Sequence, residues 1–126
     1  NQLTAAIREA AIGKAKKDAI SAIAAAYRAF AHQRPGLYRA IVATPDRNCP
    51  GMQTAIANMM AVLKTVLTPY HLTDEDKTHA VRGLRSLMHG FVSLEAAGWF
   101  ASSVDREESY NQLIATFICG VEASHE

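Results

Sequence analysis

The chain has 126 residues, of which 49% are hydrophobic and 20% charged, and its formal net charge at pH 7 is +1. This length suits a single domain, residues 1–126, with one core that needs no disulfide or metal. No apolar run approaches the ~20 residues of a membrane-spanning helix, and so small a net charge gives no field for holding nucleic acid. Cys49 and Cys119 lie far apart in a sequence without a signal peptide, which indicates free thiols in a reducing cytoplasm.

The predicted elements are all helices, because alanine is abundant and strand-like alternation is missing. The first helix covers about residues 2–12 and ends at Gly13. The second begins near residues 16–18 and ends before Pro35-Gly36, and a short third helix covers 37–43. The apolar stripe of the second helix has spacings of three, four and three residues and consists of Ile20, Ile23, Tyr27 and Phe30.

A loop at residues 46–51 precedes the fourth helix, and Pro50 suits the first turn of that helix. Its apolar residues recur at spacings of four and three until Thr68-Pro69 ends it. This predicted buried stripe consists of Met52, Ile56, Met59, Leu63, Val66 and Tyr70, with Met60 and Leu67 beside it.

The fifth and sixth helices complete an all-α bundle of about six helices. Thr73, followed by an acidic turn, predicts the start of the fifth helix, which runs to about Gly98, and Asp105 predicts the start of the sixth. Their apolar faces are broader than one small domain needs, which suggests a homodimer built on a four-helix bundle of these two helices and their copies. The alternative is that both helices complete the core of a monomer, and periodicity favours neither. The candidate residues for the dimer seam are Leu94, Trp99, Tyr110, Ile114, Phe117 and Val121.

Two polar residues stand out on the fifth helix. We expect the ring of His89 to bond a neighbouring helix, with Gly90 permitting close approach, although a place at the rim of a ligand cavity is an alternative. Glu95 shares a stripe with apolar residues, and a buried carboxylate needs a partner. Arg28 or Arg39 is expected to supply that partner as a structural ion pair, and a ligand would be the alternative.

A set of aromatic and thioether side chains spreads over several of the predicted helices. Such residues most often form ordinary core. Methionine also lines permissive binding surfaces, and tyrosine hydroxyls add a few polar groups to an apolar space, so the alternative is a cavity for a small, largely apolar molecule. The candidate cavity residues are Tyr27, Phe30, Tyr38, Met59, Met60, Met88 and His89.

Signs of catalysis and of metal binding are weak. Glu75 and His79 stand four residues apart near His71 and Asp76, but a solvated acidic helix start explains them better than a metal site does. The sequence has no glycine-rich phosphate loop, HExxH, nucleophile elbow or CxxC pair. We therefore expect no enzymatic activity, no metal and no cofactor.

Three segments of the sequence carry a family resemblance. They are Ala26-Tyr27-Arg28-Ala29-Phe30-Ala31, then Pro35-Gly36-Leu37-Tyr38, and the block from His89-Gly90-Phe91 to Gly98. With Glu108-Ser109-Tyr110 before the last helix, the chain resembles the C-terminal half of tetracycline-repressor (TetR) family transcription regulators, in the branch with a His-Gly signature. Members of that branch often carry a tryptophan just before the His-Gly pair, whereas here Trp99 comes after it.

The resemblance implies a cytoplasmic sensor of a small-molecule effector that forms a homodimer and binds DNA only through a separate N-terminal helix-turn-helix domain, which is not visible in this chain. By analogy the effector cavity lies within residues 19–91 and the dimer bundle within 74–98 and 105–121. A stand-alone helical carrier of an apolar ligand or haem is the alternative function, and a small all-α enzyme is a more distant one.

Overall fold

The computed structural model describes residues 1–43 and 48–123, and within these ranges every regular element is a helix, which confirms the all-α prediction. The predicted loop residues 46 and 47 lie outside the described residues. In chain order the elements are α1 (Gln2–Ala11), α2 (Lys16–Gln33), α3 (Pro35–Val42), α4 (Pro50–Leu67), a 3-10 turn η1 (Thr68–Tyr70), α5 (Asp74–Ala96) and α6 (Arg106–Ala123).

Local capping signals determine where the helices begin. The Oδ1 atom of Asn1 accepts a hydrogen bond from the amide of Thr4 at 2.8 Å at the start of α1. The Oγ1 atom of Thr73 accepts one from the amide of Asp76 at 3.1 Å at the start of α5, where the first turn is acidic as predicted. Pro35 and Pro50 begin α3 and α4. Proline is accepted there because an amide in the first helical turn has no carbonyl partner within the helix.

Two glycines with positive φ end helices. Gly13, with φ of +75°, follows α1, and Gly98, with φ of +84°, follows α5. The amide of Gly98 donates to the carbonyl of Glu95 at 3.1 Å, and the amide of Trp99 donates to the carbonyl of Leu94 at 3.0 Å. These two hydrogen bonds satisfy carbonyl groups in the last turn of α5. They depend on the positive φ of Gly98, which a residue without a Cβ adopts at little cost.

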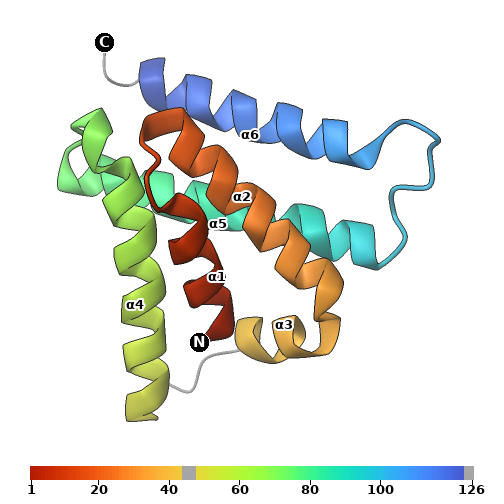
Figure 1. Ribbon diagram of the computed structural model, residues 1–126, viewed down its shortest axis with the longest axis horizontal. Helices are drawn as coiled ribbons and strands as arrows, with labels where there is room; N and C mark the ends of the chain where they lie inside the picture. The colour runs from red at the N-terminus through yellow and green to blue at the C-terminus, as the bar shows by residue number, and fades with distance from the viewer. Residues whose placement is uncertain (44–47, 124–126) are drawn as a thin grey trace.

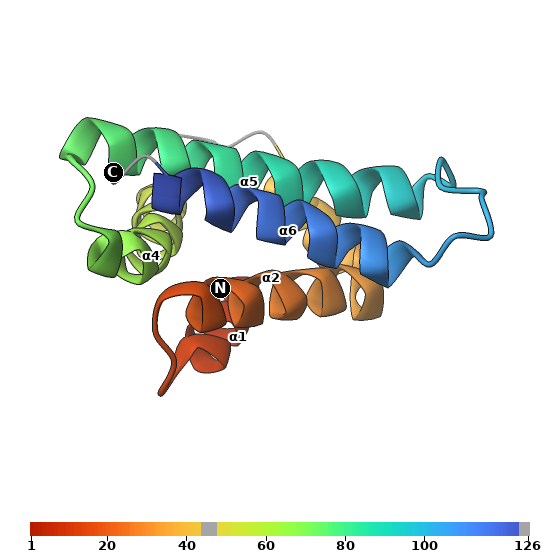
Figure 2. The same cartoon turned by 90° about the horizontal axis from the view of Figure 1, so that it is seen from above.

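Helix α2 lies between the hairpin of α5 and α6 on one side and α1 on the other. Figures 1 and 2 show α5 and α6 lying side by side in opposite directions as a helical hairpin, with α2 crossing one face of it and α1 on the far side of α2. Helix α4 packs against α1, α2 and α5 at the end of the hairpin away from its connecting loop, and the short α3 follows directly from the end of α2. Within the described ranges, no helix is long and apolar enough to cross a membrane.

The core lies where α2 meets the other helices. The stripe predicted for α2 is buried, as is the half of the α4 stripe that begins at Met59. The most deeply buried residues come from four helices: Ile7, Ile20, Ile23, Leu63, Leu67, Leu84 and Met88. Burying such aliphatic side chains is the main driving force for folding, so the core fixes the positions from which the polar residues of α2, α3 and α5 project.

Candidate functional site

A hydrogen-bonded row of rings joins α2, α3 and α5. The hydroxyl oxygens of Tyr27 and Tyr38 lie 2.6 Å apart, and the Tyr38 hydroxyl lies 2.6 Å from Nδ1 of His89. Nε2 of His89 is 3.5 Å from the hydroxyl of Ser93. Burial raises the pKa of both tyrosines, so both phenols stay protonated at neutral pH. His89 therefore bonds a neighbouring helix, as expected from the sequence, whereas Gly90 closely approaches none of the described residues.

A buried carboxylate at the end of α5 is held by three basic side chains. Glu95, whose side chain is only 4% exposed, accepts from Nε of Arg28 at 3.1 Å and from its Nη2 at 2.8 Å. Nε2 of His32 lies 2.5 Å from Oε1, and Nε of Arg106 lies 3.4 Å from Oε2. The bidentate bond from Arg28 is the main reason that the pKa of Glu95 is lowered, and it raises the pKa of Arg28 in turn. The ion pair predicted for Glu95 is present, and Arg28 rather than Arg39 supplies it.

Aromatic contacts fix the other side of Arg28. Its guanidinium carbon lies 6.0 Å from the ring centroid of Phe91 on α5 and 5.7 Å from that of Tyr110 on α6. The hydroxyl of Tyr110 donates to the backbone carbonyl of Ala24 at 2.6 Å. Arg28 thus links α2 to both helices of the hairpin, through charge on one side and through ring faces on the other.

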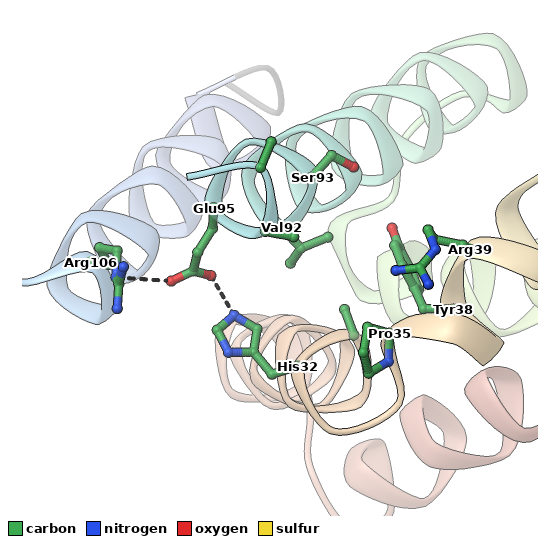
Figure 3. A pocket seen from close by; sticks show the side chains of 11 residues that line it. His32, Pro35, Tyr38, Arg39, Val92, Ser93, Glu95 and Arg106 are labelled. Carbon is green, nitrogen blue, oxygen red and sulfur yellow. Dashed lines mark hydrogen bonds and ion pairs between the residues drawn. The ribbon is translucent and has the colours of Figure 1, made fainter. Parts of the chain in front are cut away.

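A cavity of about 550 Å³ opens beside this cluster, bounded by α2, α3, the end of α5 and the start of α6. Figure 3 shows Glu95 and Arg106 at one side of it, and Tyr38 and Arg39 at the other. The volume is that of a typical small-molecule site. Most of the lining side chains are small or apolar; the full lining consists of Ala31, His32, Pro35, Tyr38, Arg39, Val92, Ser93, Glu95, Ala96, Ala97 and Arg106.

The residues predicted for a ligand cavity are not all brought together. Tyr38 lines the 550 Å³ cavity. Tyr27, Met60 and His89 line a separate hollow of about 270 Å³, and Met59 borders a smaller one of about 60 Å³. The remaining two predicted residues, Phe30 and Met88, belong to the buried core, and Met88 has no exposed surface.

The residues predicted for a dimer seam also divide into two groups. Leu94 and Trp99 are exposed, at 44% and 74%, and Phe117 is partly exposed beside Gly83. The other three, Tyr110, Ile114 and Val121, are buried within the chain.

Sequence reasoning missed most of the cavity wall. Neither His32 nor Arg106 was predicted to contribute, and Arg39 was considered only as a partner for Glu95. One signal was available: Arg28 and His32 stand one helical turn apart on the face of α2 that meets Glu95. No comparable signal marks Arg106, which reaches Glu95 only because the loop after Gly98 turns the chain back on itself.

The fold and the cavity define an all-α domain in which a ligand-sized cavity adjoins a C-terminal helical hairpin. Residues 20–117 match the family model described as "Tetracyclin repressor-like, C-terminal domain". The chain belongs to this family, as its sequence resemblance predicts.

Two curated relatives agree with this assignment. An HTH-type transcriptional regulator of Mycobacterium tuberculosis is 32% identical over 111 residues, which cover 87% of this chain and 50% of the relative. Another, from Bacillus subtilis, is 34% identical over 104 residues, covering 82% of this chain and 53% of the relative. The chain therefore spans about half the length of these relatives.

Proposed function

We propose that this chain is the effector-binding and dimerisation domain of a cytoplasmic, non-enzymatic TetR-type transcriptional regulator. Its relatives are named as HTH-type transcriptional regulators, so DNA contact would be made by a helix-turn-helix domain of the whole protein. The effector is a small molecule with a largely apolar body, and its binding changes the affinity of that domain for DNA.

The observation that carries this proposal is the shared wall between the cavity and the hairpin. The end of α5 supplies Val92, Glu95 and Ala96 to the lining, and the first residue of α6, Arg106, lies beside Glu95. The opposite wall belongs to α2 and α3. A molecule that fills the cavity therefore touches both the hairpin and the helices that pack on it, so binding favours one relative position of the two.

The same hairpin offers a face for a second copy of the chain. On α5, Leu87, Gly90 and Leu94 follow one another at helical spacing next to the buried stripe, and Leu113 and Phe117 do so on α6. We name these five residues the hairpin face. Each is partly or largely exposed in the single chain. A two-fold dimer that covers this face would form the four-helix bundle expected from the sequence, with Leu94 and Phe117 kept from the predicted seam.

Native mass spectrometry of gently purified protein tests both parts of the proposal. The expected result is a dimer in which each chain carries one small-molecule adduct. Ala96→Trp would fill the cavity from an exposed position at the end of α5, so this variant should remain dimeric and lose the adduct. The matched control is Ala57→Trp, at an exposed position of α4, and it should keep both. A monomer would contradict the dimer, and an adduct that survives Ala96→Trp would contradict this cavity.

A further inference from the structure

The charged groups around the cavity differ in whether they already have partners. Both oxygens of Glu95 are occupied, because Oε1 faces Arg28 and His32 while Oε2 faces Arg28 and Arg106. The lowered pKa of this carboxyl, caused mainly by Arg28, keeps it charged at neutral pH and satisfied by those partners. A cationic ligand would thus have to displace an arginine or a histidine to reach Glu95, and burial makes that displacement costly.

Arg39 is in the opposite situation. It lines the cavity from α3, and the part of the chain that the structure describes offers it no ion pair. Its Nη2 atom would lie 3.9 Å from a Cβ placed on Gly36, so the guanidinium folds back along α3, on the side of the cavity where Figure 3 labels Pro35 and Tyr38. A guanidinium in this position has its donors available for an anionic group, which arginine binds with directed hydrogen bonds.

The cavity wall between Arg39 and the Glu95 cluster is mainly apolar. Ala31 and Pro35 supply it from α2 and α3, and Val92, Ala96 and Ala97 supply it from the end of α5. These side chains have no hydrogen-bonding groups, so this part of the wall favours the apolar body of a ligand over a second polar group. The cavity therefore combines the Arg39 guanidinium, to which the described residues offer no ion pair, with a largely apolar wall.

We infer that the effector is an amphipathic carboxylate, whose anionic group pairs with Arg39 and whose apolar body lies against Ala31, Pro35, Val92 and Ala96. This inference rests on the proposed function, since it names the ligand class of the same cavity. Arg106 lies on the side of the cavity opposite Arg39 and is already paired with Glu95 (Figure 3). The carboxylate of the ligand is therefore oriented toward Arg39 on α3.

Isothermal titration of the protein with three probes that share one alkyl chain tests this orientation. The probes are decanoate and decylamine, each below its micelle concentration, and 1-decanol below its solubility limit. Decanoate should bind about tenfold more tightly than 1-decanol, as expected for one charge-assisted hydrogen-bonded contact, and decylamine should bind most weakly. Arg39→Gln should remove the preference for decanoate and leave the affinity for 1-decanol unchanged. Arg8→Gln, which removes the same charge from an exposed position of α1, should change neither.

The failures are distinguishable. If 1-decanol or decylamine binds as tightly as decanoate, or if Arg39→Gln weakens decanoate and 1-decanol equally, the carboxylate inference is overturned while the apolar cavity stands. If decanoate binding persists in Ala96→Trp, the probe binds elsewhere and the inference is overturned. If none of the three probes binds, the cavity does not accept apolar ligands, and the inference and the effector part of the proposed function fail together.

Discussion

Glu95 is a carboxylate with almost no contact with water, and such a group is stable only when its partners replace the lost hydration. Its three basic partners come from two helices: Arg28 and His32 from α2, and Arg106 from α6. Because Glu95 is itself near the end of α5, one side chain ties three helices together at the mouth of the cavity.

Glu95→Gln should destabilise the protein by about 3 kcal/mol, because Arg28 would keep its charge and lose its carboxylate in a partly buried place. Urea unfolding followed by circular dichroism measures the change. Arg106→Gln is the matched control: the Arg106 side chain is 55% exposed and its contact with Glu95 is 3.4 Å, so the loss should stay below about 1 kcal/mol. Equal losses in the two variants would mean that Arg28 is not the main partner.

The pH dependence of stability gives an independent check on the same carboxyl. The pKa of Glu95 is lowered in the folded state from its ordinary value of 4.5, mainly by Arg28. The charged form therefore contributes its full stabilisation above the ordinary value, and the contribution is lost as the pH falls through the lowered pKa. The difference in unfolding free energy between the wild type and Glu95→Gln should accordingly shrink when urea unfolding is repeated at about pH 7, 5 and 3. A difference that stays constant would show that Glu95 is not paired in solution.

At the scale of the helix, two methionines predicted to line a cavity, Met88 on α5 and Met60 on α4, differ in how deeply they are buried. Met88 lies on the stripe that faces the core and has no exposed surface, although it was predicted as a cavity residue. Met60, on α4, is only partly buried and borders two of the hollows. The same residue type therefore serves in two environments, and spacing alone does not separate them.

Met88→Ala should cost about 3 kcal/mol in unfolding free energy, because the core around it closes only partly over the space left behind. Met60→Ala removes the same atoms from a partly solvated place and should cost about 1 kcal/mol. Thermal unfolding at equal protein concentration compares the two variants. If Met88→Ala were as mild as Met60→Ala, Met88 would be lining a cavity instead of filling the core.

The positions of the helices were predictable because their ends are signalled locally. Thr73, Pro50 and Gly98 each mark an end through their own backbone or side-chain chemistry, and the structure places the ends within a few residues of the prediction. The third helix begins at Pro35, two residues earlier than predicted, because proline is accepted in a first helical turn as well as after a helix end.

The cavity was less predictable, because its contacts join residues that are distant in sequence. Arg28 and Glu95 are 67 residues apart, and Tyr38 and His89 are 51 apart. Periodicity identifies a buried stripe but not the helix that covers it. For the same reason periodicity alone, which predicts Tyr110 for a dimer seam, does not reveal that its side chain is buried in the single chain with its hydroxyl bonded to the backbone of Ala24 on α2.

At the scale of the whole molecule, the hairpin of α5 and α6 is exposed on one face and lines the cavity at one end. On the proposed function, a ligand that moves the end of α5 changes the geometry of the dimer, and the separation of two DNA-binding domains would follow. The hairpin face is therefore where the dimer is best tested without disturbing the cavity or the core.

Gly90→Arg should convert the dimer into a folded monomer. A Cβ on Gly90 would meet no atom of the described residues within 4 Å, and Gly90 is partly exposed, so a side chain can leave the helix there toward solvent. Replacing glycine within a helix should also add up to about 1 kcal/mol of helix stability. In a two-fold dimer through the hairpin face, the two introduced arginines would come close to the axis, where their like charges repel and their side chains clash. Analytical ultracentrifugation measures the molecular mass, and circular dichroism measures the fold.

Ala57→Arg on α4 is the control for added charge, since Ala57 is exposed and lies outside the hairpin face. This variant should remain dimeric, so that loss of the dimer in Gly90→Arg alone assigns the interface to the hairpin. A dimer that survives Gly90→Arg would place the interface on another surface, and the shared wall would then no longer connect the cavity to dimerisation. Gly90→Arg is decisive because its effect on the single chain is expected to be neutral or stabilising, so loss of the dimer would not be a consequence of unfolding.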